Sequence, residues 1–100
     1  MLNRQKIIEI LKKERPALAE HFGIRKIAIF GSFAKDVATR NSDVDIFVEF
    51  DKPLGLKFID LADYLEKAFG RKADILTSQG IRGIRIKEVS HRIRRELRYV

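Results

Sequence analysis

The stretch that most constrains the fold is DVDIFVEF, residues 43–50, because carboxylate and apolar side chains alternate along it. In a β-strand, successive side chains point to opposite faces of the sheet. One face therefore carries three branched apolar residues, Val44, Ile46 and Val48. The other face carries Asp43, Asp45 and Phe47. The pattern predicts a strand that buries one face under helices and presents carboxylates on the opposite face.

Two more segments have the composition of strands, RKIAIF at residues 25–30 and KADILT at residues 72–77. If the last strand lies beside residues 43–50 in register, Asp74 joins Asp43 and Asp45 on one face. We therefore expect an α+β (mixed α/β) domain spanning residues 1–100. Its small mixed sheet has helices packed on one face and an acidic cluster on the open face.

The remaining segments show helical spacing. Asn3 is placed to cap a first helix, and Pro16 is suited to the first turn of a short second helix that ends at Gly23. A further helix, with apolar residues from Phe58 to Phe69, ends at Gly70. A last apolar stripe is expected to be core, with arginines outside it, and consists of Ile86, Val89, Ile93, Leu97 and Val100.

Three clustered aspartates are unfavourable without a counter-charge. Two like charges ~4 Å apart repel by about 4 kcal/mol at the effective dielectric of a protein surface. A divalent cation converts this repulsion into attraction, and hard oxygen ligands select Mg²⁺ or Mn²⁺. Two such ions ~3.5–4 Å apart can hold the attacking and leaving oxygens of a phosphoryl displacement. The aspartates therefore predict a two-metal site for phosphoryl transfer.

Gly31 and Ser32 directly follow the buried strand 25–30. Glycine lets the backbone approach a ligand closely, and the amides of a following helical turn can bind phosphate oxygens together with the serine hydroxyl. Lys35 or Arg40 can add positive charge near the leaving pyrophosphate. The pattern favours a loop that binds a triphosphate tail beside the metal site.

The segment FGSFAKDVATRNSDVDIFVEF, residues 30–50, resembles the signature of the DNA polymerase beta-type nucleotidyltransferase superfamily, in particular the minimal nucleotidyltransferases of prokaryotes. The resemblance covers most of the chain and implies that fold. It implies that Gly31 and Ser32 contact the triphosphate and that Asp43 and Asp45 bind the metals. Asp74, in ADILT, would be the third metal-binding carboxylate and would help to deprotonate the acceptor hydroxyl. The family usually has glycine where this chain has Asp36.

Members of this family are commonly encoded beside a helical HEPN-type protein as toxin–antitoxin pairs. The resemblance therefore implies an antitoxin that moves AMP from ATP, with Mg²⁺, onto a tyrosine of an RNA-cleaving toxin. Two alternatives stay open. The chain can be a binding module that neutralises its partner by complex formation without chemistry, or it can transfer nucleotides to RNA.

The RNA alternative rests on an uneven charge distribution. The formal net charge is +7, and residues 80–100 hold seven Lys and Arg against two Glu. Such a segment suits RNA, nucleotide phosphates or an acidic protein. The chain has no cysteine, which excludes disulfides and cysteine-ligated zinc. It has no apolar run of membrane-spanning length, so we expect a cytoplasmic protein without membrane contact, of a size at which self-association is no surprise.

Overall fold

The sheet is organised around β2 (Val44–Phe50), which has a neighbour on each side. The computed structural model describes residues 2–100 and gives the strand order β3-β2-β1-β4. β1 (Ile24–Phe30) runs antiparallel to β2, whereas β3 (Ala73–Thr77) runs parallel to it. The two-residue strand β4 (Arg98–Tyr99) pairs with the outer side of β1 and is too short for a sequence pattern to indicate. The mixed sheet expected from the sequence is confirmed.

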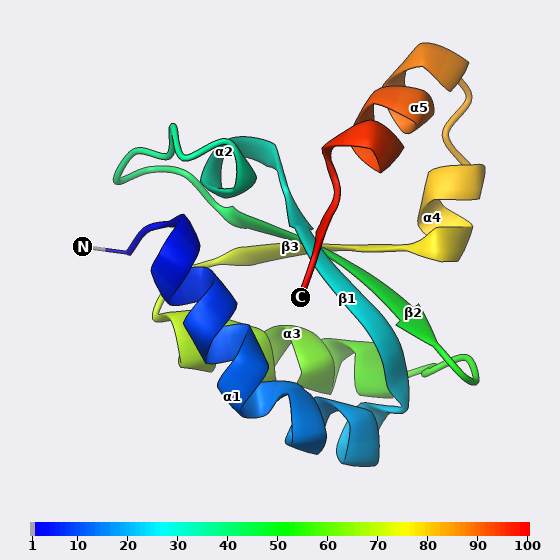
Figure 1. The fold of residues 1–100 in the computed structure, drawn as a ribbon. Coiled ribbons are helices and arrows are strands. Elements are labelled where there is room, and N and C mark those ends of the chain that lie inside the picture. Colours follow the sequence, from blue (N-terminus) through cyan, green and yellow to red (C-terminus); the bar gives the residue numbers. More distant parts are fainter. Residues whose placement is uncertain (1) are drawn as a thin grey trace.

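Two long helices, α1 (Arg4–Phe22) and α3 (Lys57–Phe69), lie together below one face of the sheet in Figure 1. The three branched side chains of β2 point toward this layer and are fully buried there, as their alternation predicts. They form the main core with apolar residues of both helices, among them Ile7, Leu11, Leu18, Leu61 and Leu65. None of the helices in residues 2–100 is long and apolar enough to cross a lipid bilayer.

The N-terminal segment forms one helix, so the predicted break at Pro16 is wrong. The side chain of Asn3 accepts a hydrogen bond from the backbone N–H of Lys6, and Gly23 ends the helix at φ +63°, both as expected. Pro16 lies inside the helix, where it removes one backbone hydrogen bond. Leu11 and Leu18, on either side of the proline, are both fully buried against the sheet. Tertiary packing on both halves thus outweighs the local cost of the proline.

The opposite face of the sheet is only partly open. A second, smaller core lies there and consists of Ala28, Phe47, Ile81 and Leu97. Ile81 belongs to the short helix α4 (Ser78–Arg82), which follows β3 directly and was not indicated by any sequence pattern. The acidic face is therefore open at the end where β2 begins and covered toward the end where α4 lies. The prediction that helices pack on one face alone is wrong in this respect.

The C-terminal apolar stripe is not a core helix. α5 (Lys87–Glu96) contains no buried residue, and Ile86 before it is 61% exposed. The chain becomes extended at Leu97, which is buried, and then forms β4 beside β1. The stripe therefore divides between α5, at the upper right of Figure 1, whose Ile93 packs partly against the second core, and a strand that completes the sheet.

Candidate active site

The structure brings the three predicted aspartates to one end of the sheet. Asp45 of β2 and Asp74 of β3 are register partners in a parallel pair, so their side chains lie on the same face. Asp43 precedes β2 by one residue, and by alternation it shares the face of Asp45. The expectation that β3 lies beside β2 in this register is confirmed, and the acidic cluster follows from it.

Asp45 has the most perturbed environment of the three. Its pKa is raised to about 6, first by burial and then by the nearby charges of Asp74 and Asp43. A carboxylate normally loses its proton near pH 4. The protein thus holds a half-buried carboxyl group that resists ionisation unless positive charge is supplied nearby. Perturbed groups of this kind are typical of functional sites.

Gly31 closes the cluster on the side of β1. Phe30, the last residue of β1, is the register partner of Asp45, and Gly31 then turns the chain away at φ +72°. A Cβ atom at Gly31 would lie 2.1 Å from Oδ2 of Asp45. Both the backbone conformation and the close approach therefore require glycine. The predicted close approach at Gly31 is present, and the group that approaches is the carboxylate of Asp45.

Ser32 lies in α2 (Gly31–Ala34), a single helical turn that follows β1 directly. It follows Gly31, the residue that the Asp45 carboxylate approaches, and the sequence predicts the triphosphate loop at these two residues. Lys35, which follows α2, forms an ion pair with Glu96 of α5, with 2.9 Å between Nζ and Oε1. This contact holds α5 next to the turn.

Asp36 adopts the conformation that a glycine would have. Its φ is +61°, and among the described residues it is the only one other than glycine with a positive φ. Aspartate tolerates this left-handed conformation better than most residues. Its N–H donates to the carbonyl of Phe33, and the N–H of Val37 donates to the carbonyl of Ser32. The turn therefore keeps the course that the family's glycine allows.

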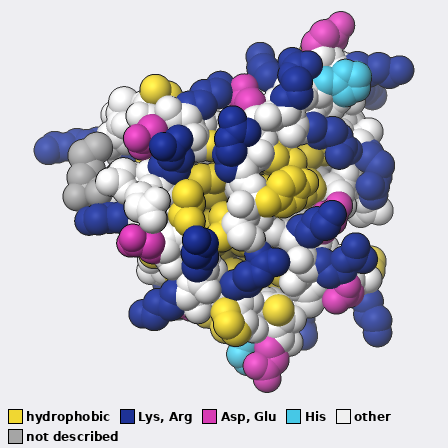
Figure 2. Space-filling view, in the orientation of Figure 1, with side chains coloured by type: hydrophobic (Ala, Val, Ile, Leu, Met, Phe, Trp, Pro, Cys, Tyr) yellow, Lys and Arg dark blue, Asp and Glu magenta, His cyan; other side chains and the backbone are white. Residues whose placement is uncertain are grey.

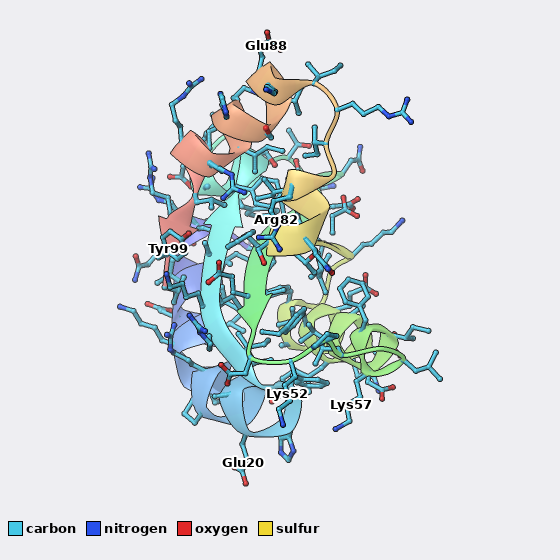
Figure 3. All side chains as sticks on the ribbon, turned by 90° about the vertical axis from the view of Figure 1, so that its right-hand side faces the viewer. Glu20, Lys52, Lys57, Arg82, Glu88 and Tyr99 are labelled. Carbon is cyan, nitrogen blue, oxygen red and sulfur yellow. The ribbon has the colours of Figure 1, made fainter. Side chains whose placement is uncertain are left out.

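The three aspartates lie on an open part of the surface and not in a pocket. Asp74 is exposed, whereas Asp43 and Asp45 are half-buried. A hollow of about 350 Å³ lies at the other end of β2, between the turn after β2 and α4. Figure 3 labels Lys52 and Arg82, one from each of these two segments. The residues that line the hollow do not include the three aspartates, so the hollow and the acidic cluster are separate features.

The donor set fits a divalent metal ion of the magnesium type. The available ligands are carboxylate oxygens, and burial together with mutual repulsion disfavours their charged forms, which a bound cation would relieve. Within residues 2–100 no three acidic or histidine side chains already converge as a closed metal cage. Mg²⁺ does not need one, because it commonly keeps several waters and binds one or two carboxylates together with substrate phosphates.

Sequence reasoning missed Arg71, which follows α3. Its Nη1 donates to the carbonyls of Thr39 and Ser42, at 2.9 and 3.0 Å, and its guanidinium lies 5.4 Å from the centre of the Phe33 ring. These contacts span about thirty residues of chain and end on backbone carbonyls. No sequence pattern could have indicated them.

The fold and this cluster together define a nucleotidyltransferase. The chain belongs to the nucleotidyltransferase domain family, whose model matches residues 4–98. Protein adenylyltransferase MntA of Thermococcus cleftensis is 37% identical over 101 residues, which cover 100% of this chain and 98% of that protein. The candidate protein adenylyltransferase MJ1379 of Methanocaldococcus jannaschii is 37% identical over 88% of this chain and 91% of its own.

Solved structures share this fold. A structure described as a candidate minimal nucleotidyltransferase superposes with a TM-score of 0.77 at 24% identity, over 97% of this chain and 95% of that chain. The fold expected from the sequence is confirmed. A toxin–antitoxin crystal structure with AMP-PNP superposes with a TM-score of 0.64 at 25% identity, over 98% of this chain and 72% of that chain.

Proposed function

We propose that this chain is a Mg²⁺-dependent protein adenylyltransferase that moves AMP from ATP onto a tyrosine of a HEPN-type toxin and so acts as its antitoxin. The observation that carries the proposal is the meeting of Asp43, Asp45 and Asp74 beside Gly31. The names of the curated relatives, protein adenylyltransferases, and a related toxin–antitoxin structure with AMP-PNP support the class of reaction and partner.

In this proposal Asp43, Asp45 and Asp74 hold two Mg²⁺ ions, or Mn²⁺ in their place. The ions would supply charge neutralisation at the phosphates and would lower the pKa of the attacking hydroxyl. Gly31 and Ser32 hold the triphosphate through the amides and hydroxyl of the α2 turn. Because the pKa of Asp45 is raised, a cation held beside this carboxylate would favour its charged form.

The chemical step is a displacement at the α-phosphorus of ATP. The tyrosine oxygen of the partner forms the new P–O bond, the bond from the α-phosphorus to the bridging oxygen breaks, and pyrophosphate leaves. Asp74 is the most exposed of the three carboxylates, which suits it to meet the incoming hydroxyl and accept its proton. A modified tyrosine then carries a bulky anionic group, which would silence the toxin.

The experiment that tests the proposal is intact-mass analysis of the protein encoded beside this chain. That protein is incubated with ATP and Mg²⁺, with and without this chain, and with the Asp43→Asn variant as the control. A gain of one or more AMP units that requires this chain and is lost with the variant supports the proposal. A complex that forms without any gain in mass contradicts it and favours neutralisation by binding alone.

Transfer to RNA is the second candidate function, because α5 and its flanking residues are strongly basic. Figure 2 shows Lys and Arg side chains gathered over α4 and α5, with few acidic ones between them. The basic residues of this segment are Arg82, Arg85, Lys87, Arg92, Arg94, Arg95 and Arg98. Binding of a single-stranded RNA oligonucleotide that weakens steeply as salt rises would support this candidate. Absent or salt-independent binding would exclude it.

A further inference from the structure

We propose that Arg71 is a positioning residue for the acidic cluster, an inference that rests on the proposed function. Arg71 lies in the connection between α3 and β3 and contacts neither ATP nor an acceptor in the mechanism above. It instead contacts the two segments that carry the site, namely the turn before Asp43 and the helical turn α2.

The first contact fixes the turn that leads into β2. The N–H of Ser42 donates to the carbonyl of Thr39 at 3.1 Å, and the N–H of Thr39 donates to the hydroxyl of Ser42 at 2.9 Å. Nη1 of Arg71 reaches both carbonyls of this turn, at 2.9 and 3.0 Å. The carbonyl of Ser42 belongs to the peptide unit that continues into Asp43. Arg71 therefore sets the orientation of the peptide from which the Asp43 side chain projects.

The second contact is with α2. The guanidinium of Arg71 lies over the ring of Phe33, 5.4 Å from its centre, and Phe33 is 1% exposed. Phe33 follows Ser32 directly, so a flat cation on its ring limits how the α2 turn can move. One side chain thus ties the predicted triphosphate turn to the start of the metal-binding strand.

The segment between these two contacts has little other structure to fix its position. Residues 35–43 connect α2 to β2 with no helix or strand of their own, and six of the nine are exposed. One of them, Asp36, holds a left-handed conformation. The charge of Arg71 is not drawn into an ion pair, since within residues 2–100 the ion pairs are Arg25–Asp51, Lys26–Glu49 and Lys35–Glu96. The guanidinium therefore serves the two carbonyls and the ring.

A guanidinium is required for this role. The two N–H groups of Nη1 point in fixed directions within the guanidinium plane, toward the two carbonyls, while the flat face of the guanidinium covers the ring. A lysine ammonium is instead a compact point charge without a flat face. Arg71→Lys keeps the charge and most of the length but loses the fixed in-plane N–H directions and the flat face. The expected result is a fold that forms with a displaced Asp43. Mutation of a residue that orients a metal ligand typically lowers metal affinity or activity by about 10–100-fold.

The test compares Arg71→Lys with Arg25→Lys, a matched control in an exposed ion pair at the opposite end of β1 from Gly31. Binding of Mn²⁺ is measured by calorimetry in the presence of a non-hydrolysable ATP analogue, and kcat and KM for ATP are measured with the partner. We expect Arg71→Lys to weaken Mn²⁺ binding and lower kcat by about 10–100-fold, with a much smaller change in KM. The control should match the wild type in all three.

Two results would overturn the proposal. If Arg71→Lys only lowers the melting temperature while the folded molecules bind Mn²⁺ and turn over as the wild type does, Arg71 stabilises the loop without positioning the site. If nothing changes, the contacts have no role. The Mn²⁺ titration separates this inference from the proposed function. A wild type that binds Mn²⁺ but transfers no AMP would contradict the proposed function, and the variant's affinity would still decide the role of Arg71.

Discussion

The two faces of the sheet follow opposite physical rules. On the face toward α1 and α3, the side chains of β2 are fully buried apolar groups with apolar neighbours. On the other face the same strand presents Asp45, with Asp43 just before the strand, Asp74 beside it on β3, and only a small apolar cluster farther along. The first face stabilises the fold. The second concentrates like charges, which disfavours the folded protein unless positive charge is supplied nearby, and the proposed function places its chemistry on this face of a strand seven residues long.

The largest expected effect is on chemistry. Asp43→Asn removes the charge of a proposed metal ligand while keeping the shape of the side chain, so we expect AMP transfer to fall about a thousandfold or more, equivalent to about 4 kcal/mol of barrier. The melting temperature without metal should not fall, because the variant also removes repulsion. Transfer is measured by intact mass, and a variant that transfers normally would show that the metal assignment is wrong.

The matching change on the helix face is Ile46→Ala. Ile46 is fully buried in the main core, and truncation of such a residue typically costs about 2–5 kcal/mol of unfolding free energy. Urea unfolding measures this loss. Binding of Mn²⁺ by the folded fraction should stay close to that of the wild type. A loss of metal binding larger than the loss of folded protein would mean that the two faces are not independent.

Gly31→Ala tests the close contact between the Gly31–Ser32 turn and the carboxylate of Asp45. The left-handed conformation costs an ordinary residue about 1–2 kcal/mol, and the new methyl group would push the carboxylate of Asp45 aside. We expect lower stability together with a loss of Mn²⁺ affinity. Gly23→Ala is the control, because Gly23 has a similar φ but nothing within 4 Å of its added Cβ. If both variants lose only stability, the displacement of Asp45 is unimportant.

Asp45→Asn should stabilise the metal-free protein at neutral pH. The pKa of Asp45 is about 6 in the folded state against 3.8 normally, so the folded state favours the protonated form. The stability that this group contributes is therefore present below pH 4 and is lost as pH rises through 6. Allowing for solvent screening of a half-buried group, the variant should gain about 1–2 kcal/mol at pH 7.

Urea unfolding at several pH values without metal measures this effect. The difference between Asp45→Asn and the wild type should be small at pH 4 and should grow until pH 7. A difference that does not depend on pH would mean that the ionisation of Asp45, which is disfavoured first by burial and then by the charges of Asp74 and Asp43, is not its cause.

The smallest expected effect is a change in stability at Asp36, in the loop between α2 and β2. Asp36→Gly should stabilise the protein by less than about 1 kcal/mol, because glycine adopts the left-handed conformation without strain but loses more entropy on folding. Asp36→Ala should destabilise it, because alanine has no polar group to support that conformation. Thermal unfolding ranks the three proteins. Equal stability of the glycine and alanine variants would show that the conformation at this position is not maintained in solution.

The sequence alone determined the features that depend on local chemistry and on the periodic spacing of apolar residues. The alternation in residues 43–50 predicted which side chains of β2 are buried, and Asn3, Gly23 and Gly70 marked helix ends correctly because capping is decided within one turn. The pairing of Asp45 with Asp74 could be stated only as a condition, since register between strands about thirty residues apart depends on how the whole sheet assembles.

Tertiary structure decided the rest, because distant packing can override or complete a local pattern. It kept α1 continuous through Pro16 by burying Leu11 and Leu18, and it divided the C-terminal stripe by pairing β4 with β1. It also joined Arg71 to carbonyls about thirty residues earlier in the chain. Backbone carbonyls are present at every residue, so only the folded chain can show which of them an arginine reaches.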